Sequence, residues 1–260
     1  MERTWNPNDL PVDFKLTWHH FPDPSLLGLD AAGNIAWIDN KFTGVPAMRA
    51  GTTSTTGRQV PAIVNGYTTA SGPKGSKGII MLGDVNTFPQ GDQDRYMMLI
   101  AMNNGDGGVL AGYKHDNGGS NWWFDSDFVV RGSNNGQFNA GSVPSKTLHA
   151  FVARHRSGVT SLRVDGVQRA SRALTLTGAN PFNQQIGIRG ARDDYYTMGG
   201  CTLACIFGRR DATDDENFLL EAWSAPFTGK AIPADNPYAL GLPVFSDGQS
   251  RKTPRSFYFL

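Results

Sequence analysis

The chain has 260 residues, with 31 glycines, 15 prolines and a formal net charge of +1. Frequent turn-forming residues over this length favour a single all-β domain of many short strands. The nearly neutral charge argues against nucleic acid as a partner, because phosphate binding needs a basic excess. No run approaches the ~20 apolar residues that span a bilayer, which argues against a membrane as a partner.

We divide the chain into three parts of one domain. Residues 1–66 are rich in Pro, Asn, Asp and Thr and form an irregular segment with the first short strands. Residues 67–233 hold the predicted core, and residues 234–260 form a C-terminal arm. From residue 78 to residue 130, apolar runs alternate with turns rich in Gly and Asn, a pattern that predicts an antiparallel meander.

The strongest local prediction is the hairpin from Leu148 to Ala170. Residues 159–164 (VTSLRV) alternate in polarity, so that every second side chain shares one face. Asp165 and Gly166 then form a turn of the type that requires positive φ. These features are structural requirements, so we expect no catalytic residue in this hairpin.

Two further strands are predicted at residues 182–189 and 200–207. The second holds both cysteines, Cys201 and Cys205. On a regular strand they share one face about 13 Å apart, at ~3.3 Å per residue. A disulfide needs Cα atoms within roughly 7 Å, so we expect free, buried thiols in a protein made in a reducing cytosol.

One helix is predicted near the C-terminus. Thr213 can cap it, and Glu216 completes a capping box three residues later. An apolar stripe follows on one side of the helix, and Pro226 is expected to end it.

Residues 148–154 (LHAFVAR), a Ser-Gly turn and residues 161–167 (SLRVDGV) resemble the hairpin signature of laminin-G- and pentraxin-like domains. Residues 185–190 (QIGIRG) and 199–207 (GGCTLACIF) resemble later strands of that family. The resemblance implies an all-β, two-sheet antiparallel jelly-roll sandwich of the concanavalin A-like/laminin-G-like kind, with one short helix near the C-terminus. This fold hosts lectins, adhesins, glycosidases and structural modules, so by itself it implies no single function.

Residues 30–40 (DAAGNIAWIDN), 58–61 (RQVP) and 65–66 (NG) are similar to a pattern of phage and bacterial concanavalin-like proteins. Residues 236–240 (NPYAL) are similar to the tail of phage-encoded members. The resemblance implies a non-enzymatic structural or accessory protein of a tailed-bacteriophage virion, as capsid decoration or tail appendage, with weak host-glycan binding. The alternatives are a free lectin or adhesin module, and a polysaccharide-degrading enzyme of the same fold.

The virion role carries its own expectations about partners and location. Other virion proteins and a cell-surface glycan would be the partners, and the chain would form a symmetric homo-oligomer. The first residues lack the apolar core of a secretion signal. We therefore expect folding in the host cytoplasm without a signal peptide, followed by incorporation into the virion.

Aromatic and acidic side chains mark the candidate glycan contacts, since sugars stack on aromatic rings and carboxylates fix their hydroxyls. Alternation over residues 122–124 sends the two tryptophans to opposite faces, so at least one of them belongs to the core. A polar, aromatic loop lies at residues 192–196. The predicted glycan contacts are Trp122, Trp123, Asp125, Asp127, Arg192, Asp193, Tyr195 and Tyr196.

The pair Asp125 and Asp127 comes nearest to the paired carboxylates of a glycosidase. Glutamate occurs only at positions 2, 216 and 221, outside the strand region. The sequence therefore predicts no catalytic residue and no enzyme. We also expect no cofactor, with calcium as the open alternative, because Asp and backbone oxygens bind this ion. The candidate calcium ligands are Asp106, Asp193 and Asp194.

The C-terminal segment combines basic and aromatic residues. An extended apolar end can add as a strand to a neighbour's sheet edge, or it can pair with an edge of its own domain. Both alternatives stay open. The predicted docking residues are Arg251, Lys252, Arg255, Phe257, Tyr258 and Phe259.

Overall fold

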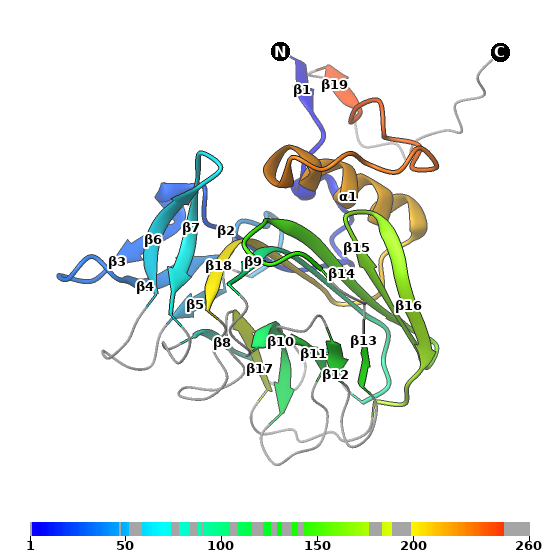
Figure 1. Cartoon of the computed structure of the whole chain (residues 1–260), viewed down its shortest axis with the longest axis horizontal. Coiled ribbons are helices and arrows are strands. Elements are labelled where there is room, and N and C mark those ends of the chain that lie inside the picture. The colour runs from blue at the N-terminus through cyan, green and yellow to red at the C-terminus, as the bar shows by residue number, and fades with distance from the viewer. Residues whose placement is uncertain are drawn as a thin grey trace.

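The computed structural model describes residues 2–46, 48–51, 59–73, 78–83, 88–89, 91–104, 109–115, 122–125, 129–131, 137–139, 143–176, 184–188 and 199–246. Two large antiparallel sheets pack face to face, and α1 lies on the outer side of one of them (Figure 1). The predicted all-β, two-sheet antiparallel sandwich with a single α-helix near the C-terminus is confirmed for the described residues.

The nine-stranded sheet has the order β13-β12-β11-β10-β17-β8-β5-β4-β3. Its strands are β3 (Leu27–Leu29), β4 (Ile35–Asp39), β5 (Arg49–Gly51), β8 (Ile79–Gly83), β10 (Val109–His115), β11 (Trp122–Asp125), β12 (Val129–Arg131), β13 (Gln137–Asn139) and β17 (Gln184–Ile188). The predicted meander over residues 78–130 is confirmed only for β10, β11 and β12, which pair consecutively. It is wrong for the earlier strands, because β8 pairs with β17 and β5, and β9 (Arg95–Asn103) belongs to the other sheet.

The eight-stranded sheet has the order β16-β15-β14-β9-β18-β7-β6, and β2 also pairs with β18. Its strands are β2 (Lys15–His20), β6 (Val60–Val64), β7 (Tyr67–Gly72), β9 (Arg95–Asn103), β14 (His149–Arg156), β15 (Val159–Val164), β16 (Val167–Ala173) and β18 (Gly200–Gly208). Two short 3-10 helices, η1 (Pro7–Asp9) and η2 (Pro24–Leu26), belong to the N-terminal segment. A separate ribbon pairs β1 (Glu2–Thr4) with β19 (Val244–Ser246), so residues near the two ends of the described chain lie side by side.

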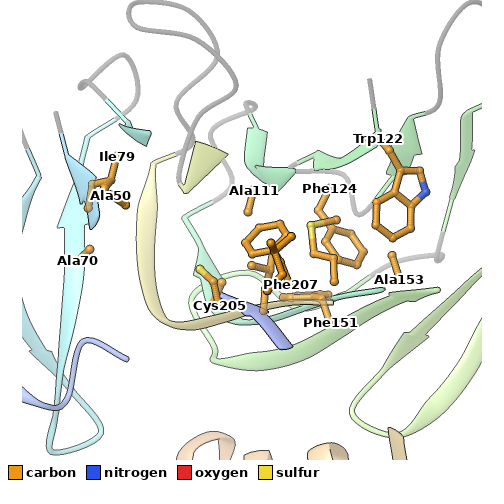
Figure 2. Packing of buried hydrophobic residues seen from close by; sticks show 14 of the residues in the cluster. Ala50, Ala70, Ile79, Ala111, Trp122, Phe124, Phe151, Ala153, Cys205 and Phe207 are labelled. Atoms are coloured by element: carbon orange, nitrogen blue, oxygen red, sulfur yellow. The ribbon is translucent and has the colours of Figure 1, made fainter. Parts of the chain in front are cut away.

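The main core lies between the two sheets. Figure 2 shows Ala111, Trp122 and Phe124 of the nine-stranded sheet directed toward Phe151 and Phe207 of the other sheet. A second apolar cluster fills the space between the eight-stranded sheet and α1 (Asp214–Thr228). The eight-stranded sheet is thus covered on both faces, because its outer face is buried by the helix and the N-terminal segment.

The hairpin from Leu148 to Ala170 is present as predicted. β14 and β15 pair in register, and β15 continues into β16 through Asp165 and Gly166. These two turn residues have φ values of 50° and 77°, the left-handed conformation that this hairpin turn requires. The alternation is also confirmed, since every second residue of β15 is buried.

Helix α1 begins as predicted and ends later than predicted. Thr213 accepts from the Glu216 backbone N–H at 3.2 Å, and the Glu216 carboxylate accepts from the Thr213 N–H at 2.8 Å. The prediction that Pro226 ends the helix is wrong, because α1 continues through Pro226 to Thr228. The proline leaves the carbonyl of Ala222 without its usual helical donor, yet the helix runs two residues further, and Gly229, at φ 67°, closes it.

Both cysteines are free and buried, as predicted. Their predicted placement on one face is wrong, since Cys201 belongs to the cluster under α1 and Cys205 to the core between the sheets. A register shift between Thr202 and Ala204 in β18 causes the difference. A bulge of this kind reverses the alternation for every residue that follows it.

Candidate functional site

The outer face of the nine-stranded sheet has no helix over it among the described elements. Helix α1 packs on β14 and β9, which belong to the other sheet. A sheet face without a covering helix can leave its side chains accessible to ligands, so this face is the candidate site.

Backbone pairing defines one row of residues that crosses all nine strands of this sheet. In the order of the strands the row contains Gly28, Trp37, Gly51, Ile80, Gly187, Gly112, Trp123, Arg131 and Gln137. The chain neighbours Ala50, Ala111 and Phe124 are buried between the sheets. Because successive residues of a strand belong to opposite faces, the row belongs to the outer face.

Glycine occupies four of the nine positions in this row. Inside a strand, a glycine costs roughly 0.5–1 kcal/mol relative to alanine, and it often marks a place where another group approaches the backbone closely. At Gly28 this group is visible. A Cβ atom there would lie 1.9 Å from Cε2 of Trp37, so only glycine lets the indole lie across β3.

Trp37 carries a charged pair on its ring. The guanidinium of Arg49 lies over the indole, with its Cζ atom 3.6 Å from the ring centroid. The Arg49 Nε and Nη2 groups donate to the two carboxylate oxygens of Asp39 at 2.8 and 3.3 Å. The Arg49 and Asp39 side chains are 55% and 38% exposed, so the pair is open to solvent.

This cluster of Trp37, Arg49 and Asp39 combines three kinds of contact. The indole packs against Gly28 and carries the guanidinium on its ring, the carboxylate accepts hydrogen bonds, and the guanidinium donates them. A hydroxyl group can donate to the carboxylate and accept from the guanidinium at the same time. The exposed donors and acceptors therefore suit a polyhydroxylated ligand such as a sugar.

The structure contradicts one of the predicted glycan contacts. Trp122 is 0% exposed and packs in the core between the sheets with Phe124 (Figure 2). A sugar has no access to a ring in this position. The register explains the placement, because Phe124 pairs with the buried Ala111 and alternation puts residue 122 on the same side.

The side chains of the other predicted contacts lie outside what the structure describes. Trp123 and Asp125 belong to β11 by their backbone, and their side chains lie outside the described part of the structure. The remaining predicted residues lie wholly outside the described residues: Asp106, Asp127, Arg192, Asp193, Asp194, Tyr195, Tyr196, Arg251, Lys252, Arg255, Phe257, Tyr258 and Phe259. Among the described residues, no group of three or more His, Cys, Asp or Glu side chains gathers as a metal site would require.

Sequence reasoning missed Trp37, Arg49 and Asp39. The available signal was the glycines inside the predicted strands, since they mark close approaches. What approaches each glycine depends on cross-strand register, and residues 28, 37 and 51 belong to three different strands.

A second cluster has the residue types of a nucleophilic triad but serves the fold. His155 Nδ1 lies 2.8 Å from Thr160 Oγ1, and its Nε2 lies 3.0 Å from Asp92 Oδ1. Thr160 and His155 are fully buried, so no substrate reaches the hydroxyl. Burial lowers the pKa of His155, and Asp92 also accepts from the Leu176 N–H. The cluster therefore ties two loops to the β14–β15 hairpin.

No helix in the described part of the chain combines the length and apolar character needed to cross a membrane. No family model matches the sequence. No curated protein matches it either.

Solved structures do share the fold. Domain 4 of an extracellular GH43 arabinanase from Geobacillus stearothermophilus, in complex with arabinotriose, matches with a TM-score of 0.54 at 12% identity, over 77% of this chain and 95% of that one. Trypanosoma rangeli sialidase matches with a TM-score of 0.53 at 11% identity, over 80% of this chain and 32% of the sialidase. Its complex with the inhibitor DANA matches with the same TM-score and identity, over 77% and 31%. The chain thus spans about a third of the sialidase it resembles.

These likenesses support the sandwich fold, and that fold occurs in carbohydrate-active proteins. They correct the prediction that the chain has no enzymatic role, since the neighbours come from an arabinanase and a sialidase. The prediction rested on the rarity of glutamate in the strands, which is too narrow a criterion for a fold found in such enzymes. The likenesses give no support to a phage origin.

Proposed function

We propose that this chain is a carbohydrate-binding sandwich domain that holds glycans on the outer face of its nine-stranded sheet. The observation that carries the proposal is the cluster of Trp37, Arg49 and Asp39. Arg49 stacks on the Trp37 ring and donates two hydrogen bonds to Asp39, and this charged pair is open to solvent. The match to an arabinanase domain solved with arabinotriose, over 95% of that domain, is consistent with it.

The rest of the register row extends this face. Trp123 and Arg131 are neighbours in the row on β11 and β12. Five strand spacings separate Trp37 from Trp123, about 24 Å at ~4.8 Å per strand. Three glycines, Gly51, Gly187 and Gly112, lie between them. The backbone row therefore continues across the sheet for several strands beyond the Trp37 cluster.

Replacing Trp37 with alanine is expected to weaken glycan binding tenfold or more, since buried aromatic anchors dominate such contacts. Binding would be measured by isothermal titration calorimetry against neutral oligosaccharides, including arabinotriose, with the positive compounds first selected on a glycan array. The thermal midpoint of the variant should stay close to that of the wild type, which separates lost binding from lost folding.

The matched control is Phe245→Ala. Phe245 also carries an arginine over its ring, with Arg3 Cζ 5.1 Å from the centroid, but it lies on the β1–β19 ribbon. Phe245→Ala should leave binding unchanged. A wild-type protein that binds no glycan on the array, or an unchanged affinity in Trp37→Ala, would refute the proposal.

A narrower proposal concerns a tailed-phage virion. It rests on the sequence pattern of residues 30–40 and on residues 236–240 (NPYAL). In this proposal the chain is an accessory protein of the particle, with other virion proteins and a second copy of itself as partners. Mass spectrometry of purified virions should then find the chain, and its absence from them would end the proposal.

A further inference from the structure

We infer that Asp39 makes the site selective for neutral sugars and excludes sugar acids such as uronates and sialic acids. This inference rests on the proposed function and names its ligand class. It starts from the bidentate pair that Arg49 forms with Asp39 beside the ring of Trp37.

An arginine on an aromatic face is by itself a carboxylate site. Its planar fork matches the two oxygens of a carboxylate, and the stacked ring holds the fork in a fixed plane. A sugar acid would therefore bind Arg49 if its fork were free. In this chain the Asp39 carboxylate, on the adjacent strand of the same sheet, already accepts from the Nε and Nη2 groups of Arg49.

The internal carboxylate has an advantage over one in solution. Asp39 and Arg49 are register partners on β4 and β5. Because both belong to one chain, they form their ion pair without the loss of translational entropy that a separate ligand pays on binding. An intramolecular partner acts at a high effective concentration, in the millimolar range or above. A sugar acid must displace this partner, so its affinity for Arg49 falls severalfold, the limit set by the weakness of an exposed ion pair.

The paired charges still leave hydrogen-bonding capacity for hydroxyls. A guanidinium has five N–H groups and an ionised carboxylate has about four acceptor positions. The pair uses two N–H groups, so three remain that no described residue takes. The site thus presents donors and acceptors without net charge, which fits a neutral polyol and offers no gain to an anion.

The experiment compares the wild type with Asp39→Asn. Titration calorimetry would use the neutral oligosaccharide with the highest affinity from the array, and trigalacturonate and sialyllactose as acidic probes. The wild type should bind the neutral probe with an affinity independent of NaCl, and it should bind the acidic probes at least tenfold more weakly. Asp39→Asn should gain severalfold for an acidic probe, as expected when an exposed competing carboxylate is removed, and this gain should fall with rising salt.

The chain offers a matched control in Asp9→Asn. Asp9 also binds an arginine in a bidentate manner, with Arg3 Nη1 and Nη2 at 2.7 and 2.6 Å, beside the ring of Phe245. This variant shows how much affinity for sugar acids a freed arginine gains away from the Trp37 cluster, and the gain of Asp39→Asn should exceed it. Thermal midpoints of both variants would confirm that they fold.

Two results would overturn the inference while the proposed function stands. One is wild-type binding of an acidic probe as tight as that of the neutral one. The other is an Asp39→Asn variant that keeps its neutral ligand and gains nothing for the acids. Absence of any glycan binding by the wild type is a different result, since it removes the proposed function itself.

Discussion

Replacing Trp122 with alanine is expected to lower the free energy of unfolding by about 3–5 kcal/mol, the usual cost of truncating a large core aromatic. The side chain is fully buried between the two sheets, next to Phe124 and above Ala153 (Figure 2). Its removal leaves a cavity that strands on both sides cannot fill without moving. Urea unfolding at neutral pH, followed by circular dichroism, would measure the change.

Trp37→Ala is the internal comparison. Its indole is half-buried on the outer face, against Gly28 and Arg49, so its loss should affect stability much less than the loss of Trp122. The two variants should therefore separate, one losing stability and the other losing glycan binding. A Trp122→Ala protein with unchanged stability and no glycan binding would show that Trp122 is a glycan contact and would contradict its place in the core.

Acidification from pH 6.5 to pH 4 is expected to destabilise the protein through His19 and His20. Burial lowers the pKa of each of these histidines to about 4, and Lys41 lowers that of His20 further while Asp23 opposes the shift. In the unfolded chain both imidazoles take up protons near pH 6.5. Below that pH the unfolded state binds more protons than the folded state, so stability falls until the folded pKa is reached.

The size of this effect follows from the width of the window. A single histidine contributes up to ~1.4 kcal/mol per pH unit, which over this window is on the order of 3 kcal/mol. Urea unfolding at half-unit steps from pH 7.5 to pH 4.5 would measure the slope.

His20→Phe is the variant that isolates one of the two histidines. The His20 ring packs between Trp18, Trp223 and Phe227, with centroid distances of 5.5, 5.8 and 5.7 Å. Phenylalanine keeps these aromatic contacts and cannot titrate. The variant should match the wild type at pH 7.5 and lose part of the pH slope, since His19 and the buried His155 supply the rest. An unchanged slope would show that His20 does not contribute to the acid sensitivity.

Much of the fold could be predicted from short stretches of sequence. The strands β14 to β16 follow from the alternation of polar and apolar residues. The Asp165–Gly166 turn between β15 and β16 follows from the positive φ that these two residue types tolerate. Both signals depend only on residues close together in the sequence. The start of α1 follows for the same reason, because Thr213 and Glu216 satisfy each other's backbone N–H groups. The end of α1 was mispredicted because Gly229, whose left-handed conformation caps the helix, decides where it stops and not Pro226.

The candidate site could not be predicted in the same way. Sequence reasoning looked for aromatic runs and chose Trp122, which the register of β10 and β11 buries. It overlooked Trp37, whose neighbours Gly28 and Arg49 come from two other strands. Strand order and register are set by pairings between distant segments, and short sequence patterns do not encode them.

The sequence by itself determined that this chain forms short antiparallel strands with one capped helix and free thiols, because alternation, turn chemistry and capping act within a few residues. The two-sheet sandwich was implied by the resemblance to laminin-G-like domains. Only the tertiary structure decided which tryptophan belongs to the core and which belongs to the surface. It also decided that Cys201 and Cys205 belong to different layers, and that Asp39, Arg49 and Trp37 meet on one face. These outcomes depend on a bulge in β18 and on the registers of β3, β4 and β5, which follow from packing the whole domain.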